Sequence, residues 1–179
     1  MTMDITVRAI ADIIRRPHEE MGTVVDRIRG WADVGLLKVV GDRFPGTGKR
    51  RVYEAGAIVD ALVLTGLVDA GLAAVRAGHF QGARGLDVLG FGRMGASEIL
   101  NPSKQDKKMQ FLIIQGQPTG QPAVALADEN TPLLQRSAKH AQWLIILNLT
   151  ELFRPLQGIV SVVSDHGFIQ VELVQKKGK

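Results

Sequence analysis

The side chains with the clearest chemical potential are basic residues gathered in one short stretch of the chain. Between Lys38 and Arg51 there are five Lys or Arg residues and one acidic residue, Asp42. Two short β-type runs, 38–40 and 50–53, enclose a turn-rich segment, so the stretch predicts a β-hairpin with a basic tip. Positive groups on such a hairpin can bind the phosphates of a nucleic acid. The candidate phosphate-binding residues are Arg43, Lys49, Arg50 and Arg51.

A second group of candidates lies just before the hairpin, on a segment with helical periodicity. From about Thr23, apolar residues recur on one side, while Arg27 and Arg29 can face water or a partner. A helix fits the major groove of DNA, so these two arginines are candidates for contact with bases or phosphates. Tyr53, on the returning strand, could donate its hydroxyl to a phosphate. The alternatives are a solvated helix face for the arginines and packing within the hairpin for Tyr53.

Other kinds of chemistry find little support in the sequence. The chain has no cysteine, which excludes disulfides, thiolate metal sites and cysteine nucleophiles. The four histidines are scattered without metal-ligand spacing, and the Gly-x-Gly-Lys at 46–49 lacks the full phosphate-loop pattern. No local pattern suggests a carboxylate pair for acid–base catalysis. We therefore expect neither an enzyme nor a metal or cofactor site.

Two helices must position the candidate arginines. Thr6 can cap a first short helix with an apolar face, and Pro17 interrupts that pattern. The second helix, from about Thr23, is expected to end at Gly35. Trp31 and the apolar pair 36–37 are more typical of core residues than of DNA contacts. The sequence thus predicts two helices with a tight connection, followed by the basic hairpin.

This arrangement resembles a known family of regulators. The stretch 28–37, Ile-Arg-Gly-Trp-Ala-Asp-Val-Gly-Leu-Leu, is similar to the recognition-helix signature of the MerR (mercury-resistance regulator) family. The Arg-Val-Tyr at 51–53 is similar to the Arg-x-Tyr that the family has at its returning wing strand. The resemblance covers residues 5 to about 77 and implies a winged helix-turn-helix that binds double-stranded DNA. The long dimerising helix of the family has no counterpart, because the sequence after Gly78 is Gly-rich and lacks heptads.

The rest of the chain predicts a second, smaller module. Residues 58–75 are apolar around most of a helix, and the surplus face suggests a partner. The Gly-rich segment 78–108 is predicted to be a linker or an irregular surface segment. Residues 110–115 and 123–127 predict a hairpin. The run 143–149 could be a buried strand or part of a helix beginning near 131, and we favour a strand followed by a short helix at 150–154.

These predictions define an α+β fold class: an N-terminal winged helix-turn-helix (MerR-like) followed by a small mixed α/β C-terminal module. The expected divisions are 1–77 for DNA binding, 78–108 as a linker, and 109–179 for dimerisation, sensing or partner contact. Hydrophobic residues make up 45% of the chain and charged residues 22%, which is typical of soluble globular proteins. The N-terminus does not resemble a secretory signal, and the longest apolar run, 143–147, is too short to cross a bilayer. We expect a cytoplasmic protein without membrane contact.

The leading functional hypothesis is a sequence-specific transcriptional regulator that binds double-stranded DNA as a homodimer, with RNA polymerase as a further expected partner. The net charge of +4 permits such a role without requiring it. The dimer is suggested by the apolar excess at 58–75 and 143–149, because two-fold proteins read paired half-sites. The alternative is a phage-type architectural or protein-interaction module that uses the same fold in recombination, packaging or assembly.

Overall fold

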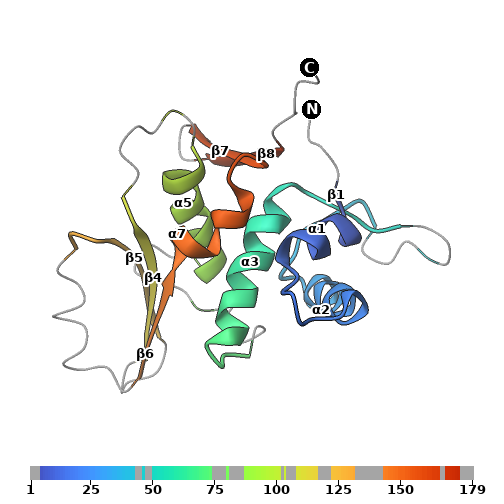
Figure 1. Cartoon of the computed structure of the whole chain (residues 1–179), viewed down its shortest axis with the longest axis horizontal. Helices are drawn as coiled ribbons and strands as arrows, with labels where there is room; N and C mark the ends of the chain where they lie inside the picture. Colours follow the sequence, from blue (N-terminus) through green and yellow to red (C-terminus); the bar gives the residue numbers. More distant parts are fainter. Residues whose placement is uncertain are drawn as a thin grey trace.

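The chain adopts an α+β fold with helices and small antiparallel sheets, as expected from the sequence (Figure 1). The computed structural model describes residues 5–42, 46, 50–73, 80, 87–101, 103, 108–116, 122–131, 143–165 and 168–173. Within these residues no helix is long and apolar enough to cross a membrane.

The N-terminal part combines two helices with a three-stranded sheet. Helices α1 (Val7–Ile14) and α2 (Met21–Asp33) are followed by strands β2 (Val39–Val40) and β3 (Val52–Tyr53). The two strands pair antiparallel, which confirms the predicted hairpin, and the two predicted helices are also present. Strand β1 (Ile5–Thr6) pairs with the other edge of β3 and was not anticipated. This pairing ties the start of α1 to the returning strand of the hairpin.

The ends of α1 and α2 follow the local signals in the sequence. The side chain of Thr6 caps α1 by accepting a hydrogen bond from the backbone N–H of Ala9 at 3.2 Å. After α2, Gly35 adopts a φ of +82°, and the N–H of Leu36 returns to the carbonyl of Trp31 at 2.8 Å. Such a turn favours glycine because a Cβ would be strained there. Trp31 and Leu36 are buried, as predicted.

Helix α3 (Gly56–Asp69) forms the centre of the molecule. Every residue from Ala57 to Leu67 is buried. Helix α1 packs on one side of α3, and helices α5 (Val88–Leu100) and α7 (Leu149–Leu152) pack on the other. The expectation that an apolar face of this helix is left over for a partner was therefore wrong, because the C-terminal half of the same chain covers it.

The Gly-rich region contains helix α5, so the prediction of a linker or irregular segment was wrong for residues 88–100. The side chain of Asp87 caps this helix by accepting a hydrogen bond from the N–H of Gly90 at 2.7 Å. Its glycines serve close packing rather than flexibility. A Cβ added to Gly92 would lie 2.6 Å from Cγ2 of Val63 on α3, and one added to Gly95 would overlap Leu149.

This close packing predicts opposite effects for two glycine-to-alanine changes. Gly92→Ala should destabilise the protein by about 1 kcal/mol, since overpacking costs about 1–3 kcal/mol and the helix-propensity gain of about 1 kcal/mol offsets only part of it. Gly30→Ala in α2 is the matched control, because no heavy atom lies within 4 Å of its added Cβ. It should stabilise the fold by up to about 1 kcal/mol. Urea denaturation measures both, and equal stabilisation by the two changes would contradict close packing at Gly92.

The C-terminal part adds a three-stranded antiparallel sheet and a hairpin. Strands β4 (Gln110–Gly116), β5 (Ala123–Asp128) and β6 (Trp143–Asn148) lie in the order β5-β4-β6, and β7 (Val160–Asp165) pairs with β8 (Phe168–Leu173). The predicted hairpin of β4 and β5 is confirmed. Residues 143–148 form a strand, so the helical alternative was wrong there. The short helix that follows begins at Leu149, one residue earlier than expected, and leads into a 3-10 turn, η1 (Arg154–Leu156).

One hydrophobic core connects the two halves of the chain. It extends from Ile10 and Ile28 of the N-terminal helices through α3 to Leu112, Ile114 and Phe153 in the C-terminal half. Figure 1 shows α5 and α7 between α3 and the sheet of β4–β6, while α1, α2 and the N-terminal sheet lie on the far side of α3. The basic hairpin and the C-terminal sheet are thus at opposite ends of the molecule. The proposed division into 1–77 and 109–179 stays a prediction.

Candidate nucleic-acid interface

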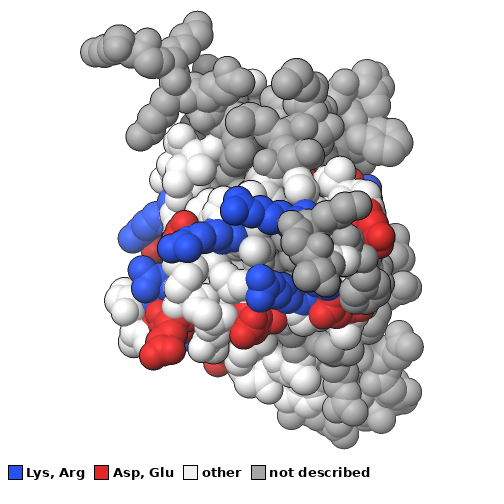
Figure 2. All heavy atoms as spheres, turned by 90° about the vertical axis from the view of Figure 1, so that its right-hand side faces the viewer, with Lys and Arg blue, Asp and Glu red and all other residues white. Residues whose placement is uncertain are grey.

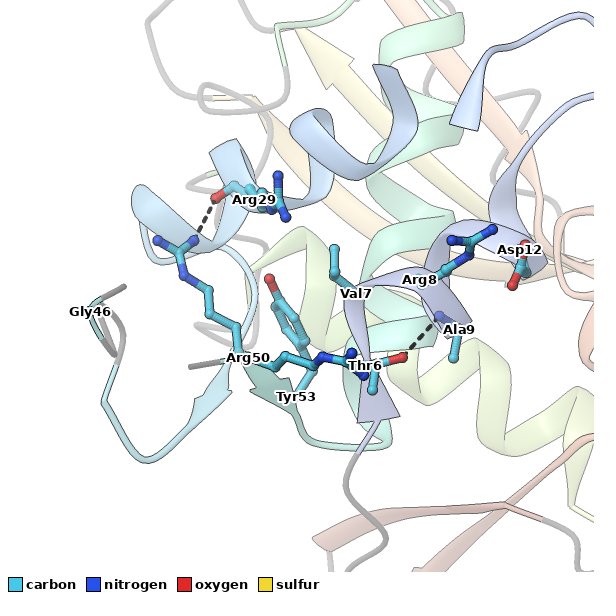
Figure 3. Close-up of a pocket in the computed structure, with 10 residues that line it drawn as sticks. Thr6, Val7, Arg8, Ala9, Asp12, Arg29, Gly46, Arg50 and Tyr53 are labelled. Atoms are coloured by element: carbon cyan, nitrogen blue, oxygen red, sulfur yellow. Dashed lines mark hydrogen bonds between the residues drawn. The ribbon is translucent and has the colours of Figure 1, made fainter. Parts of the chain in front are cut away.

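A pocket of about 820 Å³ lies where the start of α1, the end of α2 and the hairpin meet (Figure 3). Helix α1 contributes its first turn and Asp12, helix α2 contributes Arg29, and the hairpin contributes Arg50, Arg51 and Tyr53. The pairing of β1 with β3 brings these elements together, because it sets the first turn of α1 beside the returning strand. Gly46, at the described part of the hairpin tip, also lines the pocket.

The charge of this pocket is strongly unbalanced. Among the described residues of the lining, four are arginines and Asp12 is the one acidic residue: Arg8, Arg29, Arg50 and Arg51. The N-terminus of α1 adds the positive end of a helix dipole and backbone N–H groups. Figure 2 shows Lys and Arg side chains in a band across this face of the molecule, with Asp and Glu below the band and near its two ends. The arrangement suits an anion such as a phosphate.

Arg51 holds the hairpin against helix α2. Its Nη1 lies 2.7 Å from a carboxylate oxygen of Asp33 and donates to the backbone carbonyl of Arg29 at 3.5 Å. Only 18% of the Arg51 side chain is exposed. A cation at the carbonyl end of a helix also complements the helix dipole. We infer that Arg51 fixes the position of the hairpin and that its capacity for a phosphate is correspondingly reduced.

Arg29 is the candidate on α2 that remains accessible. Its side chain is 55% exposed, and Nη1 lies 3.2 Å from Oδ1 of Asp26, one turn earlier. An exposed ion pair of this type contributes little to stability and separates easily. Arg29 can therefore contact a ligand without a large cost to the fold.

Arg27, the other predicted contact on α2, points toward the protein. Its Nη1 lies 2.6 Å from Oε1 of Glu19, and its Nη2 donates to Oε2 at 3.3 Å. The guanidinium also lies 5.6 Å from the ring centre of Trp31, a cation–π distance. With 20% of its side chain exposed, Arg27 joins the α1–α2 connection to the second helix. These contacts favour a structural role for Arg27 over the predicted contact with DNA.

The Glu19–Arg27 ion pair should make the stability of the folded protein depend on pH in the acid range. The hydrogen bond from Arg27 lowers the pKa of Glu19 below its ordinary 4.5, and burial opposes the change. A lowered pKa in the folded state stabilises the protein above pH 4.5, and this stabilisation is lost as the pH falls through the folded-state pKa. Glu19→Gln should therefore cost about 1–3 kcal/mol at neutral pH, with a deficit that shrinks toward acid pH.

Thermal unfolding followed across the acid range measures this effect. Glu20→Gln is the matched control, because the neighbouring Glu20 is exposed and its side chain makes no capping hydrogen bond to α2. A deficit of Glu19→Gln that is the same at pH 7 and at acid pH would show that the pair does not couple folding to Glu19 ionisation.

Tyr53 lines the pocket although its side chain is fully buried. Its hydroxyl makes no hydrogen bond of regular geometry with the described residues, although the guanidinium of Arg51 lies near it. Burial raises the pKa of Tyr53 above its ordinary 10.0, and the nearby guanidinium of Arg51 opposes the rise. Figure 3 shows the phenol directed toward the end of α2. The burial of the side chain agrees with the alternative of packing within the hairpin, and donation by the Tyr53 hydroxyl to a phosphate stays a prediction.

The remaining predicted residues are Arg43, Lys49 and Arg50, and one residue of the pocket was not predicted. Arg43 and Lys49 lie outside the described residues, whereas Arg50 is exposed and lines the pocket. Sequence reasoning missed Arg8, which is exposed in the first turn of α1. A cation there is unfavourable for the helix dipole, and this mismatch was a usable signal. Arg8 and Arg50 make no hydrogen bond or ion pair with other described residues.

Comparison with known proteins does not identify the class of this pocket. No protein-family model, curated protein or solved structure matches the chain. Among the described residues, no group of three or more His, Asp or Glu side chains could hold a metal ion.

Proposed function

We propose that the protein is a DNA-binding transcriptional regulator of MerR-like type, whose N-terminal part works as a winged helix-turn-helix. In this proposal α1 and α2 are the paired helices, the hairpin of β2 and β3 is the wing, and α2 enters the major groove. The observation that carries the proposal is the arginine-lined pocket between these three elements. It offers a binding place for a backbone phosphate at the junction where both the helix and the wing would approach a duplex.

The outward face of α2 supports the same role. Thr23, Asp26, Arg29, Gly30 and Asp33 are exposed, while the opposite face is buried. Arginine can donate to guanine, and carboxylates can accept from the amino group of cytosine. Gly30 has open space around it, so a phosphate backbone or base edge could approach closely there. A face with donors, acceptors and no large apolar side chain suits a polar groove better than a protein core.

The two carboxylates on this face weaken its electrostatic attraction to DNA in general. Binding then depends more on the base sequence of the duplex. Asp26 and Asp33 repel phosphates unless Arg29 and Arg51 neutralise them, as their ion pairs indicate. Where a carboxylate meets a base that cannot donate to it, binding should be disfavoured. We therefore expect site-selective binding with weak affinity for unrelated duplexes.

Binding of the full chain to DNA fragments tests the proposal. Fragments from the region upstream of its own coding sequence are compared with shuffled duplexes across a salt series. We expect tight binding to one fragment that weakens linearly in log–log form as salt increases, because phosphate contacts release counterions. Absence of binding to any duplex at low salt would refute the proposal. Equal affinity for all duplexes would refute the regulator and support the architectural alternative.

A further inference from the structure

Strand β6 is an apolar edge strand whose side chains are not buried. Its sequence, Trp-Leu-Ile-Ile-Leu-Asn, is apolar except for the last residue, yet none of its six residues is buried. Neighbouring β4, with a similar apolar content, has five buried residues. The difference follows from position, because β6 is an edge of the sheet in the described order β5-β4-β6. Ile146 is 42% exposed and Trp143 is 39% exposed.

The other edge of the same sheet is protected and β6 is not. Strand β5 follows Pro122 and ends at Asp128, which forms an ion pair with Lys108. Proline and charged residues at an edge discourage pairing with another strand. Within β6 there is no charged residue and no proline. An edge of this composition presents a row of backbone groups and apolar side chains to an additional strand.

We infer that β6 pairs antiparallel with β6 of a second copy of this chain, which joins the two sheets into one. The chain carries a net charge of +4, so two copies repel unless they meet at an uncharged surface, and β6 provides one. An acidic partner would be drawn instead to the arginine-lined face, which lies at the other end of the molecule (Figure 1). A neutral, self-complementary strand is best matched by itself.

The geometry of the sheet restricts how the two copies can meet. Ile145 and Leu147 pack against the core, and Ile146 lies on the opposite face, where it pairs with Ile113 of β4. A two-fold axis perpendicular to the sheet keeps core-facing residues on the same side in both copies. Centring this axis on Ile146 places the most exposed apolar residue of β6 against its own copy. The arginine-lined pockets then lie at the two far ends of the dimer and stay free.

The oligomeric state of the full chain tests this inference without using DNA. Sedimentation equilibrium should show a dimer that dissociates on dilution over a roughly 100-fold range of concentration. Ile146→Lys should weaken the dimer by roughly 100-fold, because it places two like charges face to face and removes an apolar anchor. Ile159→Lys is the matched control, since Ile159 has the same exposed fraction of 42% but lies outside the sheet. It should leave the dimer unchanged.

Two further tests distinguish a lost interface from a lost fold, and the second does not need a folded Ile146→Lys chain. An equimolar mixture of the Ile146→Lys and Ile146→Glu chains should recover the dimer, because opposite charges then meet across the axis. Since the chain has no cysteine, Ile146→Cys should also give a disulfide-linked dimer on mild oxidation, and Ile159→Cys should not. A wild-type chain that stays monomeric would overturn the inference, as would equal cross-linking of the two cysteine variants.

Discussion

Replacing Arg93 by leucine should destabilise the protein by about 3–5 kcal/mol at neutral pH, because the change leaves a buried carboxylate without its counter-charge. Asp60 lies inside helix α3 with 1% of its side chain exposed. Arg93 reaches it from α5: Nε donates to Oδ1 at 2.8 Å, and Nη2 donates a second hydrogen bond to Oδ2. This two-point contact joins the central helix α3 to helix α5, which was not predicted from the sequence. Urea denaturation with tryptophan fluorescence measures the loss.

The destabilisation caused by Arg93→Leu should decrease as the pH falls. Burial raises the pKa of Asp60 above its ordinary 3.8, and Arg93 opposes that rise. Without Arg93 the folded protein binds a proton at Asp60 more tightly than the unfolded chain does. Stability of Arg93→Leu should therefore increase as the pH falls from neutral through the folded-state pKa toward 3.8. A deficit that is constant over this range would show that Asp60 finds another counter-charge.

A double replacement separates the charge from the packing. Asp60→Leu combined with Arg93→Leu removes both charges, and apolar substitution of a whole buried pair is often neutral. We expect the double variant to recover most of the stability that Arg93→Leu loses. Asp60→Leu alone should cost less than Arg93→Leu, because the Arg93 side chain is 39% exposed and can turn toward water. The opposite order of the two single variants would contradict this account.

The sequence was sufficient for elements with strong local signals. The Thr6 cap, the Gly35 turn and the antiparallel hairpin depend on residues close together in the chain, and all three are present. The β-type run at 110–115 likewise predicted its strand. Helix α5 was missed because its glycines resemble a flexible linker. These glycines allow Val63 and Leu149, which are far away in the sequence, to pack close to the axis of α5.

The candidate site was predictable as a region but not residue by residue. The basic hairpin was visible as a charge cluster, and Arg50 lines the pocket as a cluster of that kind suggests. The inward direction of Arg27 depends on Glu19, and the place of Arg8 depends on the pairing of β1 with β3. Neither contact follows from helical periodicity alone. Burial of α3 by α5 was equally invisible, since periodicity cannot tell which part of the chain covers an apolar face.

Removing the two pocket arginines that pair with no other described residue, Arg8 and Arg50, should have the largest effect on DNA binding. Arg8 and Arg50 come from different elements, α1 and the hairpin, and both line the pocket. The double variant Arg8→Ala and Arg50→Ala should weaken binding to the preferred duplex by roughly 100-fold at low salt, if each guanidinium–phosphate contact contributes about 1.4 kcal/mol. The slope of log affinity against log salt should fall by about 2, one for each lost phosphate contact. Fluorescence anisotropy across the salt series measures both quantities.

A control with the same loss of charge distinguishes the pocket from general attraction. Lys108→Ala with Arg154→Ala also removes two positive charges, from exposed side chains in the C-terminal half. We expect this variant to keep the wild-type slope and most of the affinity, because long-range attraction between exposed charges is largely screened beyond about 10 Å. Equal losses in the two double variants would mean that net charge, and not the pocket, attracts DNA. Retained affinity in Arg8→Ala with Arg50→Ala would contradict the pocket as the place of phosphate contact, because these side chains are the two cations of its described lining that no ion pair with a described residue holds.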